Sequence, residues 1–294
     1  MLGLAVGDAL GAPLEGAPPA VAAVAVTGGL EMTGGGWWAP GEWTDDTAMA
    51  VELAESISTL GVLATDDLAE RYIRWATTNG KGIGRTTRSA LVGARNAEDA
   101  RARAQAHYET TQLAAGNGTV MRATPIGLVA HDLDEAVAAA RLDAQLTHAD
   151  PAAAAASAAL CAALLAVREN ADPLAAARAQ TGDHPSTAVA LDAVARADES
   201  ALARLAAGSE AGACWTTLAI ALHALLVIDD YERGVGWAIA QGGDADTNAA
   251  VTGALLGYRR GATEIPDRWL NALRERERLE RAADGLAMCA ASSS

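Results

Sequence analysis

The chain builds its apolar content almost without aromatic side chains. Hydrophobic residues make up 51% of its 294 residues, yet aromatic residues account for 4% and Phe is absent. Such a core must be assembled from Ala, Leu, Val and Ile, a composition that suits closely packed helices better than sheets. Strand-like alternation is also nearly absent, so we predict an all-α protein.

Apolar positions recur at helical spacing along most of the chain, between short loops rich in Gly, Pro, Asp or Asn. We expect helices at residues 2–10, from residue 44 onward, and at 66–78, 86–97, 118–130, 133–146, 152–168, 186–207, 214–228, 231–241, 246–259 and 267–284. A weak alternation at Val21, Val24 and Val26 is too short to define a strand. No linker stands out, so we predict one domain at 1–287 and a flexible C-terminal tail at 288–294.

Charge and cysteine usage narrow the class of protein. A net charge of -15 and a pI near 4.7 argue against general nucleic-acid binding, which needs clustered Lys and Arg. Cys161, Cys214 and Cys289 are scattered and odd in number, so a reducing cytoplasm fits better than a disulfide framework. The longest apolar run, 152–167, is shorter than the roughly 20 residues that a bilayer requires. We therefore expect a cytoplasmic protein without a membrane span.

Two carboxylates and a hydroxyl lie at the start of an expected helix, directly after two glycines, in the segment Gly242-Gly243-Asp244-Ala245-Asp246-Thr247. Oxygen ligands of this kind suit hard divalent cations such as Mg²⁺ or Mn²⁺. On a continuous helix, Asp244 and Asp246 would point to different sides. Asp244 must therefore lie at or before the helix cap if both are to converge, and the glycine pair permits that entry.

A second acidic cluster, Thr44-Asp45-Asp46-Thr47, lies about two hundred residues earlier. Thr44 is a candidate N-cap with Asp45 and Asp46 in the first turn, and ordinary capping would explain this tetrad taken alone. If the two clusters face each other, their four carboxylates repel one another unless cations compensate them. We predict that the fold brings the clusters together as a two-metal centre that activates water, orients vicinal hydroxyls, or both.

Two glycine-rich turns and one histidine are candidate ligand contacts. The turns are 80–88, which includes Gly84, and 115–122, which includes Gly116-Asn117-Gly118; both open helices whose N–H groups could face an anion. Ordinary turns remain the alternative for both, and His148 alone would more often be structural. Metals, a diphosphate and sugar hydroxyls together describe a nucleotide-sugar ligand such as ADP-ribose.

Taken together, these segments resemble the ADP-ribosylglycohydrolase family, in family order and through nearly the whole chain. The resemblance rests on Gly7-Asp8-Ala9-Leu10-Gly11-Ala12-Pro13-Leu14-Glu15, Pro40-Gly41-Glu42-Trp43-Thr44-Asp45-Asp46-Thr47, Gly116-Asn117-Gly118 with Met121-Arg122, Thr147-His148, and Gly242-Gly243-Asp244-Ala245-Asp246-Thr247-Asn248. It implies a compact, single-domain orthogonal helical bundle that removes ADP-ribose from a modified side chain or small acceptor.

The resemblance also implies roles for individual residues. Two Mg²⁺ or Mn²⁺ ions would be held by Thr44, Asp45, Asp46, Asp244, Asp246 and Thr247. The catalytic group would comprise Glu15, Asp45, Asp46 and Asp246. The substrate would contact Gly84, Gly116, Asn117, Gly118 and His148.

The acceptor is the open question. Arginine-specific bacterial relatives carry an acidic residue three positions before the motif Asn, whereas this chain has Ala114 there. Arginine linkage is nevertheless our first choice, with serine-linked ADP-ribose or O-acetyl-ADP-ribose as the alternative. A non-catalytic ADP-ribose binder and a metal phosphohydrolase that cuts the diphosphate are the competing classes. We expect a monomer whose partner is an ADP-ribose-bearing substrate.

Overall fold

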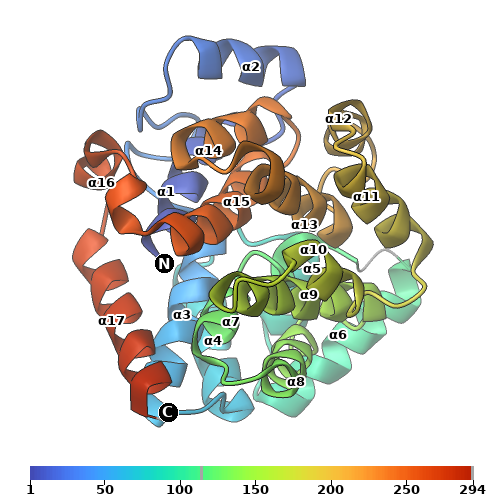
Figure 1. Ribbon diagram of the computed structural model, residues 1–294. Coiled ribbons are helices and arrows are strands. Elements are labelled where there is room, and N and C mark those ends of the chain that lie inside the picture. Colours follow the sequence, from blue (N-terminus) through green and yellow to red (C-terminus); the bar gives the residue numbers. More distant parts are fainter. Residues whose placement is uncertain (113–114, 293–294) are drawn as a thin grey trace. The chain divides into compact units, whose positions relative to one another are not determined.

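A computed structural model of the chain describes residues 1–112 and 115–292 (Figure 1). Every regular element in this described part is helical, apart from one isolated bridge between Gly35 and Trp38. The prediction of an all-α fold is therefore confirmed. Ala114, which departs from the family pattern, lies outside the described residues.

The chain divides into two compact units, each built from segments that are distant in sequence. Unit 1 comprises 1–47 and 183–280, and unit 2 comprises 48–182 and 281–294. The expected domain boundary at residue 287 stays a prediction.

Unit 1 contains eleven complete elements and parts of two more. They are α1 (Leu2–Gly11), η1 (Ala12–Leu14), α2 (Pro19–Thr27), the first turn of α3 (Asp45–Leu60), α11 (Pro185–Ala195), α12 (Glu199–Ala207), α13 (Cys214–His223), the π-helical turn η3 (Ala224–Ile228), α14 (Tyr231–Ala240), α15 (Ala245–Arg260), η4 (Ala262–Glu264), α16 (Asp267–Ala272) and the start of α17 (Arg276–Ser292).

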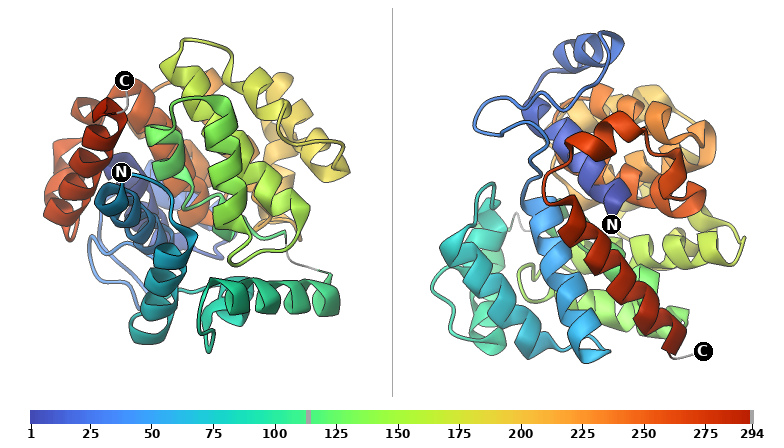
Figure 2. Two further views of the ribbon diagram at one scale, coloured as in Figure 1. Left: turned by 90° about the horizontal axis from the view of Figure 1, so that it is seen from below. Right: turned by 90° about the vertical axis from the view of Figure 1, so that its left-hand side faces the viewer.

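Helix α15 is the buried centre of unit 1 and contacts α1, α13 and α14 (Figures 1 and 2). Its approach to α1 depends on glycines. A Cβ on Gly7 would lie 2.1 Å from the carbonyl oxygen of Ala249, and a Cβ on Gly11 would lie 2.5 Å from the Cα of Asp246. No side chain fits in such a gap, so only glycine allows the end of α1 to meet the start of α15.

Unit 2 contains the remaining elements. They are the rest of α3, α4 (Thr65–Thr78), α5 (Arg85–Leu91), α6 (Ala97–Thr111), η2 (Asn117–Thr119), α7 (Thr124–Val129), α8 (Leu133–Ala144), α9 (Pro151–Arg168), α10 (Pro173–Arg178) and the rest of α17.

Helix α9 is the core helix of unit 2. It starts with Pro151 after Asp150, whose carboxylate accepts a hydrogen bond from the N–H of Ala152 at 2.8 Å, a regular N-cap. By length and composition α9 could cross a bilayer, but 72% of it is buried inside the protein, and the helices that it contacts include α7, α8 and α10. This packing accounts for its apolar sequence.

Several predicted boundaries differ from the structure. The helix expected at 186–207 is broken between α11 and α12, where Ala197 has a φ of 50°. The segment with Val21 and Val24 is helix α2, and both valines are exposed. At the C-terminus, α17 continues to Ser292, so the tail expected from residue 288 is helical that far.

Candidate functional site

The first acidic cluster is held by a buried carboxylate on α1. Asp8 is fully buried and accepts hydrogen bonds from the N–H of Thr44 at 3.0 Å, the N–H of Thr47 at 3.0 Å and the hydroxyl of Thr47 at 2.5 Å. Three donors on one carboxylate fix the first turn of α3 against α1. The sequence places Asp8 in a motif that carries the family resemblance but indicates no role for it.

The start of α3 follows the prediction. Thr44 precedes the helix, and its hydroxyl accepts a hydrogen bond from the N–H of Asp46 at 3.2 Å. Asp45 and Asp46 occupy the first turn, where the helix dipole favours negative charge. Thr44 and Asp46 are each 2% exposed, so this cap is turned away from solvent.

The start of α15 also has the predicted form. Gly242 and Gly243 have φ values of 69° and 63°, in the left-handed region that favours glycine. They lead into Asp244, which occupies the N-cap position outside the helical dihedrals, with φ −84° and ψ 67°. Asp246 and Thr247 follow in the first turn and are buried. The glycine pair therefore gives Asp244 and Asp246 the freedom to converge.

The two clusters meet within unit 1, as predicted. The hydroxyl of Thr247 donates a hydrogen bond to Oδ1 of Asp46 at 3.3 Å, across 201 residues of sequence. Oδ1 of Asp246 accepts a bond from the N–H of Thr247 at 2.9 Å. By contrast, Oδ2 of Asp46 is buried without a hydrogen-bond partner. A buried carboxylate oxygen in that state is costly unless another group compensates it.

Burial and mutual repulsion raise the pKa values of these acids. Burial first, and then the charges of Asp8, Asp244 and Glu15, raise the pKa of Asp45 to about 7. Burial and neighbouring carboxylates raise the pKa of both Asp46 and Asp246 well above the usual range. The main electrostatic contributions to these three pKa values come from other carboxylates, and such mutual repulsion favours a bound cation.

Asp8 and Glu15 complete this electrostatic group. Burial raises the pKa of Asp8 to about 6, although the bonds from Thr47 and Thr44 oppose the shift. Partial desolvation and then repulsion from Asp244 raise the pKa of Glu15, even though Glu15 as a whole residue is exposed. Glu15 is thus the most exposed residue of this acidic group.

The donor chemistry fits a hard divalent cation. Carboxylate and threonine oxygens, unbalanced negative charge and the unsatisfied Oδ2 of Asp46 all favour such an ion. Among the residues described, no three His, Cys, Asp or Glu side chains already converge as a metal-binding group. The fit therefore rests on donor type and charge, and not on a closed ligand shell.

The predicted substrate contacts gather in unit 2. His148 is buried, and its ring lies against the Gly116-Asn117-Gly118 turn: a Cβ on Gly118 would be 3.0 Å from Cε1 of His148. Nδ1 of His148 contacts the hydroxyl of Thr147 at 2.8 Å. Burial first, and then the positive charge of Arg122, lower the pKa of His148 to about 3. The imidazole is therefore neutral near pH 7.

A buried ion pair supports this turn. Nε of Arg122 donates to Asp143 at 2.9 Å, and both side chains are fully buried. Nη1 of Arg122 donates to the carbonyl oxygen of Gly118 at 3.0 Å, and the hydroxyl of Tyr72 donates to Asp143 at 3.0 Å. The sequence placed Arg122 in a motif but gave no sign of Asp143 or Tyr72, because their partners are remote in the chain.

Gly84 is less closely tied to this group. It precedes the short helix α5, and a Cβ on Gly84 would meet nothing within 4 Å. The link runs through Thr87 of α5, whose hydroxyl would lie 3.1 Å from a Cβ on Gly118. The structure thus brings Gly116, Gly118 and His148 together, with Gly84 one helical turn away from a contact.

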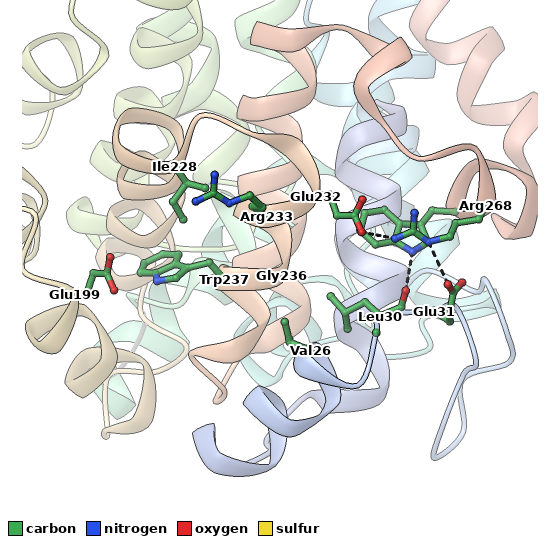
Figure 3. A pocket seen from close by; sticks show the side chains of 12 residues that line it. Val26, Leu30, Glu31, Glu199, Ile228, Glu232, Arg233, Gly236, Trp237 and Arg268 are labelled. Carbon is green, nitrogen blue, oxygen red and sulfur yellow. Dashed lines mark hydrogen bonds and ion pairs between the residues drawn. The ribbon is translucent and has the colours of Figure 1, made fainter.

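A cavity of about 470 Å³ elsewhere in unit 1 contains none of the predicted site residues (Figure 3). Arg268 on its wall pairs with Glu31 and Glu232 and lies over the ring of Trp269 at 4.7 Å (Figure 3). These charges satisfy one another. The cavity therefore lacks the unbalanced acids that distinguish the meeting point of α3 and α15.

Comparison with known proteins shows the family of the chain. The family model of ADP-ribosylglycohydrolase matches residues 1–293. The chain belongs to the ADP-ribosylglycohydrolase family. Among the relatives of this ADP-ribosylglycohydrolase-family chain is the ADP-ribosyl-[dinitrogen reductase] glycohydrolase of Rhodospirillum rubrum, 31% identical over 92% of this chain and 88% of the relative.

Two further matches have the same character. An ADP-ribosylarginine hydrolase of Serratia proteamaculans is 30% identical over 97% of this family member and 77% of the relative. A solved structure described as an ADP-ribosylglycohydrolase-related protein complex is 34% identical, with a TM-score of 0.68, and the match covers 98% of this chain and 95% of that one. The expected family and its helical fold are confirmed.

Proposed function

We propose that this chain is a divalent-metal-dependent hydrolase that releases ADP-ribose from an ADP-ribosylated acceptor, with arginine as the first-choice linkage. The observation that carries the proposal is the meeting of Asp46 and Thr247, which leaves a buried carboxylate oxygen without a partner. Family membership supports the activity. Two relatives are named as hydrolases of ADP-ribosylated protein or arginine, which supports the arginine linkage.

Two Mg²⁺ or Mn²⁺ ions would be held by oxygen donors at the two helix starts: Thr44, Asp45, Asp46, Asp244, Asp246 and Thr247. Bound there, such ions would supply charge to orient ribose hydroxyls and to acidify water. Asp8 contributes indirectly, because its hydrogen bonds hold Thr44 and Thr47 in place. Asp8 is thus a positioning residue.

Glu15 is our candidate for the proton acceptor. Glu15 is an exposed residue, but partial desolvation of its carboxyl group and repulsion from Asp244 raise its pKa towards neutral pH. In the hydrolysis, the water oxygen bonds to the anomeric carbon while the bond from that carbon to the acceptor breaks. Glu15 takes one proton from the water and then passes it to the departing atom of the acceptor, which regenerates the carboxylate.

In unit 2, the Gly116-Asn117-Gly118 turn and His148 would bind the diphosphate and ribose of the substrate, with Gly84 at the start of α5. A neutral His148 suits this task, because it can form hydrogen bonds without carrying a charge of its own. The glycines leave backbone N–H groups open to close approach by oxygen atoms. The expected monomer and cytoplasmic location stay predictions.

The test is an assay of arginine-linked, serine-linked and O-acetylated ADP-ribose with Mg²⁺ or Mn²⁺. We expect release of intact ADP-ribose from the arginine linkage, and a loss of more than about a hundredfold in kcat/KM for Asp46→Asn. Asp134→Asn on the exposed face of α8 removes one charge elsewhere and serves as the matched control. Circular dichroism checks that each variant keeps its helix content.

Each competing function predicts a different result in this assay. AMP in place of ADP-ribose would identify a phosphohydrolase, and tight ADP-ribose binding without turnover of any linkage would identify a non-catalytic binder. Full activity of Asp46→Asn in the presence of a strong chelator would contradict the role given to the acidic cluster.

A further inference from the structure

The loop that joins α2 to α3 carries an exposed tryptophan at its tip. Gly35 and Trp38 exchange backbone hydrogen bonds at 3.0 and 2.9 Å, closing a tight turn with Trp37 near its apex. Trp38 is buried and meets Trp37 edge to face, with ring centroids 6.4 Å apart. Trp37 itself is 73% exposed, the largest value among the large apolar side chains described in the structure.

This turn lies against the segment that bears Glu15. A Cβ on Gly35 would be 3.0 Å from Cβ of Pro13, so the turn touches η1 two residues before Glu15. Glu15 in turn lies close enough to Asp244 for the two charges to interact. The turn that carries Trp37 therefore packs against the segment that bears Glu15, and all of these residues belong to unit 1.

An exposed indole ring, on a turn that packs against a segment bearing a carboxylate, is suited to bind a planar organic cation. The face of Trp attracts guanidinium groups more strongly than other aromatic faces do, and a negative surrounding adds to the attraction. The acidic chain, with a net charge of -15, has the complementary sign. Of the three acceptors considered, only arginine carries such a cation, since serine and the O-acetyl group are uncharged.

We propose that Trp37 determines acceptor specificity by stacking on the guanidinium of an ADP-ribosylated arginine. This proposal rests on the proposed hydrolase function and adds the residue that recognises the acceptor. The stacked guanidinium is the leaving group, so Trp37 acts in binding and orientation and takes no part in proton transfer. Its contribution belongs mainly to KM, and it disappears for ligands that lack the arginine.

The experiment compares the wild type with Trp37→Phe and Trp37→Leu on two peptides that carry arginine-linked or serine-linked ADP-ribose. For the arginine peptide we expect Trp37→Leu to raise KM about 2- to 30-fold, with Trp37→Phe in between because it retains a ring. The binding of free ADP-ribose, which has no acceptor, should stay unchanged. Val24→Ala, which trims a 71% exposed side chain on neighbouring α2, is the matched control.

The outcomes separate the two proposals. A wild type that hydrolyses arginine-linked ADP-ribose with a KM insensitive to Trp37→Leu would overturn the role of Trp37 and leave the hydrolase function intact. If Trp37→Leu weakened the binding of free ADP-ribose as much as it raised KM for the arginine peptide, the role of Trp37 would be overturned as well. The ring would then act on the nucleotide. A wild type without activity on any linkage would overturn both proposals.

Discussion

Asp8 is the residue on which the acidic cluster depends most directly. It lies in the middle of an apolar helix, and burial raises its pKa to about 6 in spite of the hydrogen bonds from Thr47 and Thr44. The carboxylate is retained because it accepts the N–H groups that the first turn of α3 leaves without intrahelical partners. Asp8 thus acts as a helix cap supplied from another helix.

Replacing Asp8 tests this interpretation. Asp8→Ala leaves the N–H groups of Thr44 and Thr47 buried without an acceptor, which should lower the free energy of unfolding by about 2–4 kcal/mol. Asp8→Asn retains one acceptor oxygen, so its free energy of unfolding should fall by less. Urea denaturation at one pH measures both, and unchanged stability of Asp8→Ala would show that the cap is not needed.

The contrast between predicted and missed residues has a physical cause. Thr44, Asp46 and Asp244 were placed correctly because caps and first turns are encoded within a few adjacent residues. Asp8 and Asp143 were missed because the partners that explain them lie 36 or 21 residues away or further. The spacing of residues in the sequence shows an acid among apolar residues, but it does not show which distant groups bind that acid.

At the scale of elements, the packing of α1 on α15 sets the site. Gly3, Gly7 and Gly11 lie four residues apart on α1, and a Cβ on any of them would fall within 2.5 Å of the backbone of α15. Helices that approach this closely leave no room for adjustment. The glycine spacing therefore fixes how the end of α1, with Asp8, is placed against α15, which carries Asp246.

Gly7→Ala should consequently disturb both stability and the site. The new methyl group would lie 2.1 Å from the carbonyl oxygen of Ala249, so we expect a loss of about 2–3 kcal/mol in the free energy of unfolding, together with weaker divalent-metal binding. Chemical denaturation and metal titration check the two effects.

Gly236→Ala on α14 is the matched control for this change. Its Cβ would make an ordinary contact of 3.4 Å with Val26 Cγ1, so the variant should be neutral or more stable by up to about 1 kcal/mol. Equal behaviour of the two glycine variants would contradict the close-packing argument.

Long helices with strong caps were predicted well, and short or polar ones were not. Helix α9 was placed within one residue at its start, whereas α6, with few apolar residues, was missed because its core side is made of alanines. Helix α2 was missed for a different reason: Val21 and Val24 are apolar but exposed, so they mislead any argument from periodicity. Tertiary context decides such segments.

For the whole molecule, the raised carboxyl pKa values make stability depend on pH and metal together. Asp8 and Asp45 have folded-state pKa values of about 6 and about 7, above their ordinary value of 3.8. The metal-free fold therefore binds protons more tightly than the unfolded chain, and its stability falls as pH rises from about 4 through these values. Bound divalent cations should remove that penalty.

We expect a divalent metal at a hundredfold excess over its Kd at pH 7.5 to raise the free energy of unfolding by about 2–3 kcal/mol at that pH. The same metal concentration should stabilise the protein less at pH 5, where protons compete for the carboxyl groups. Calorimetry with and without metal at each pH measures this difference. Because its pKa is lowered to about 3, His148 contributes stability that is lost as pH falls below 6.5. That contribution cancels when the metal-free and metal-bound proteins are compared at the same pH. A metal-induced increase in stability that does not change with pH would contradict the prediction.

The long sequence interval between Asp46 and Thr247 has a consequence for biosynthesis. The two residues meet across 201 positions, and the whole of residues 48–182 belongs to the other unit. At roughly 5–20 residues per second, a ribosome needs about 10–40 s to deliver the second half of the site after the first. During that time the acids of the nascent N-terminal segment lack their partners on α15, whereas residues 48–182 of unit 2 are already synthesised. This part of unit 2 can therefore begin to fold before the two acidic clusters meet.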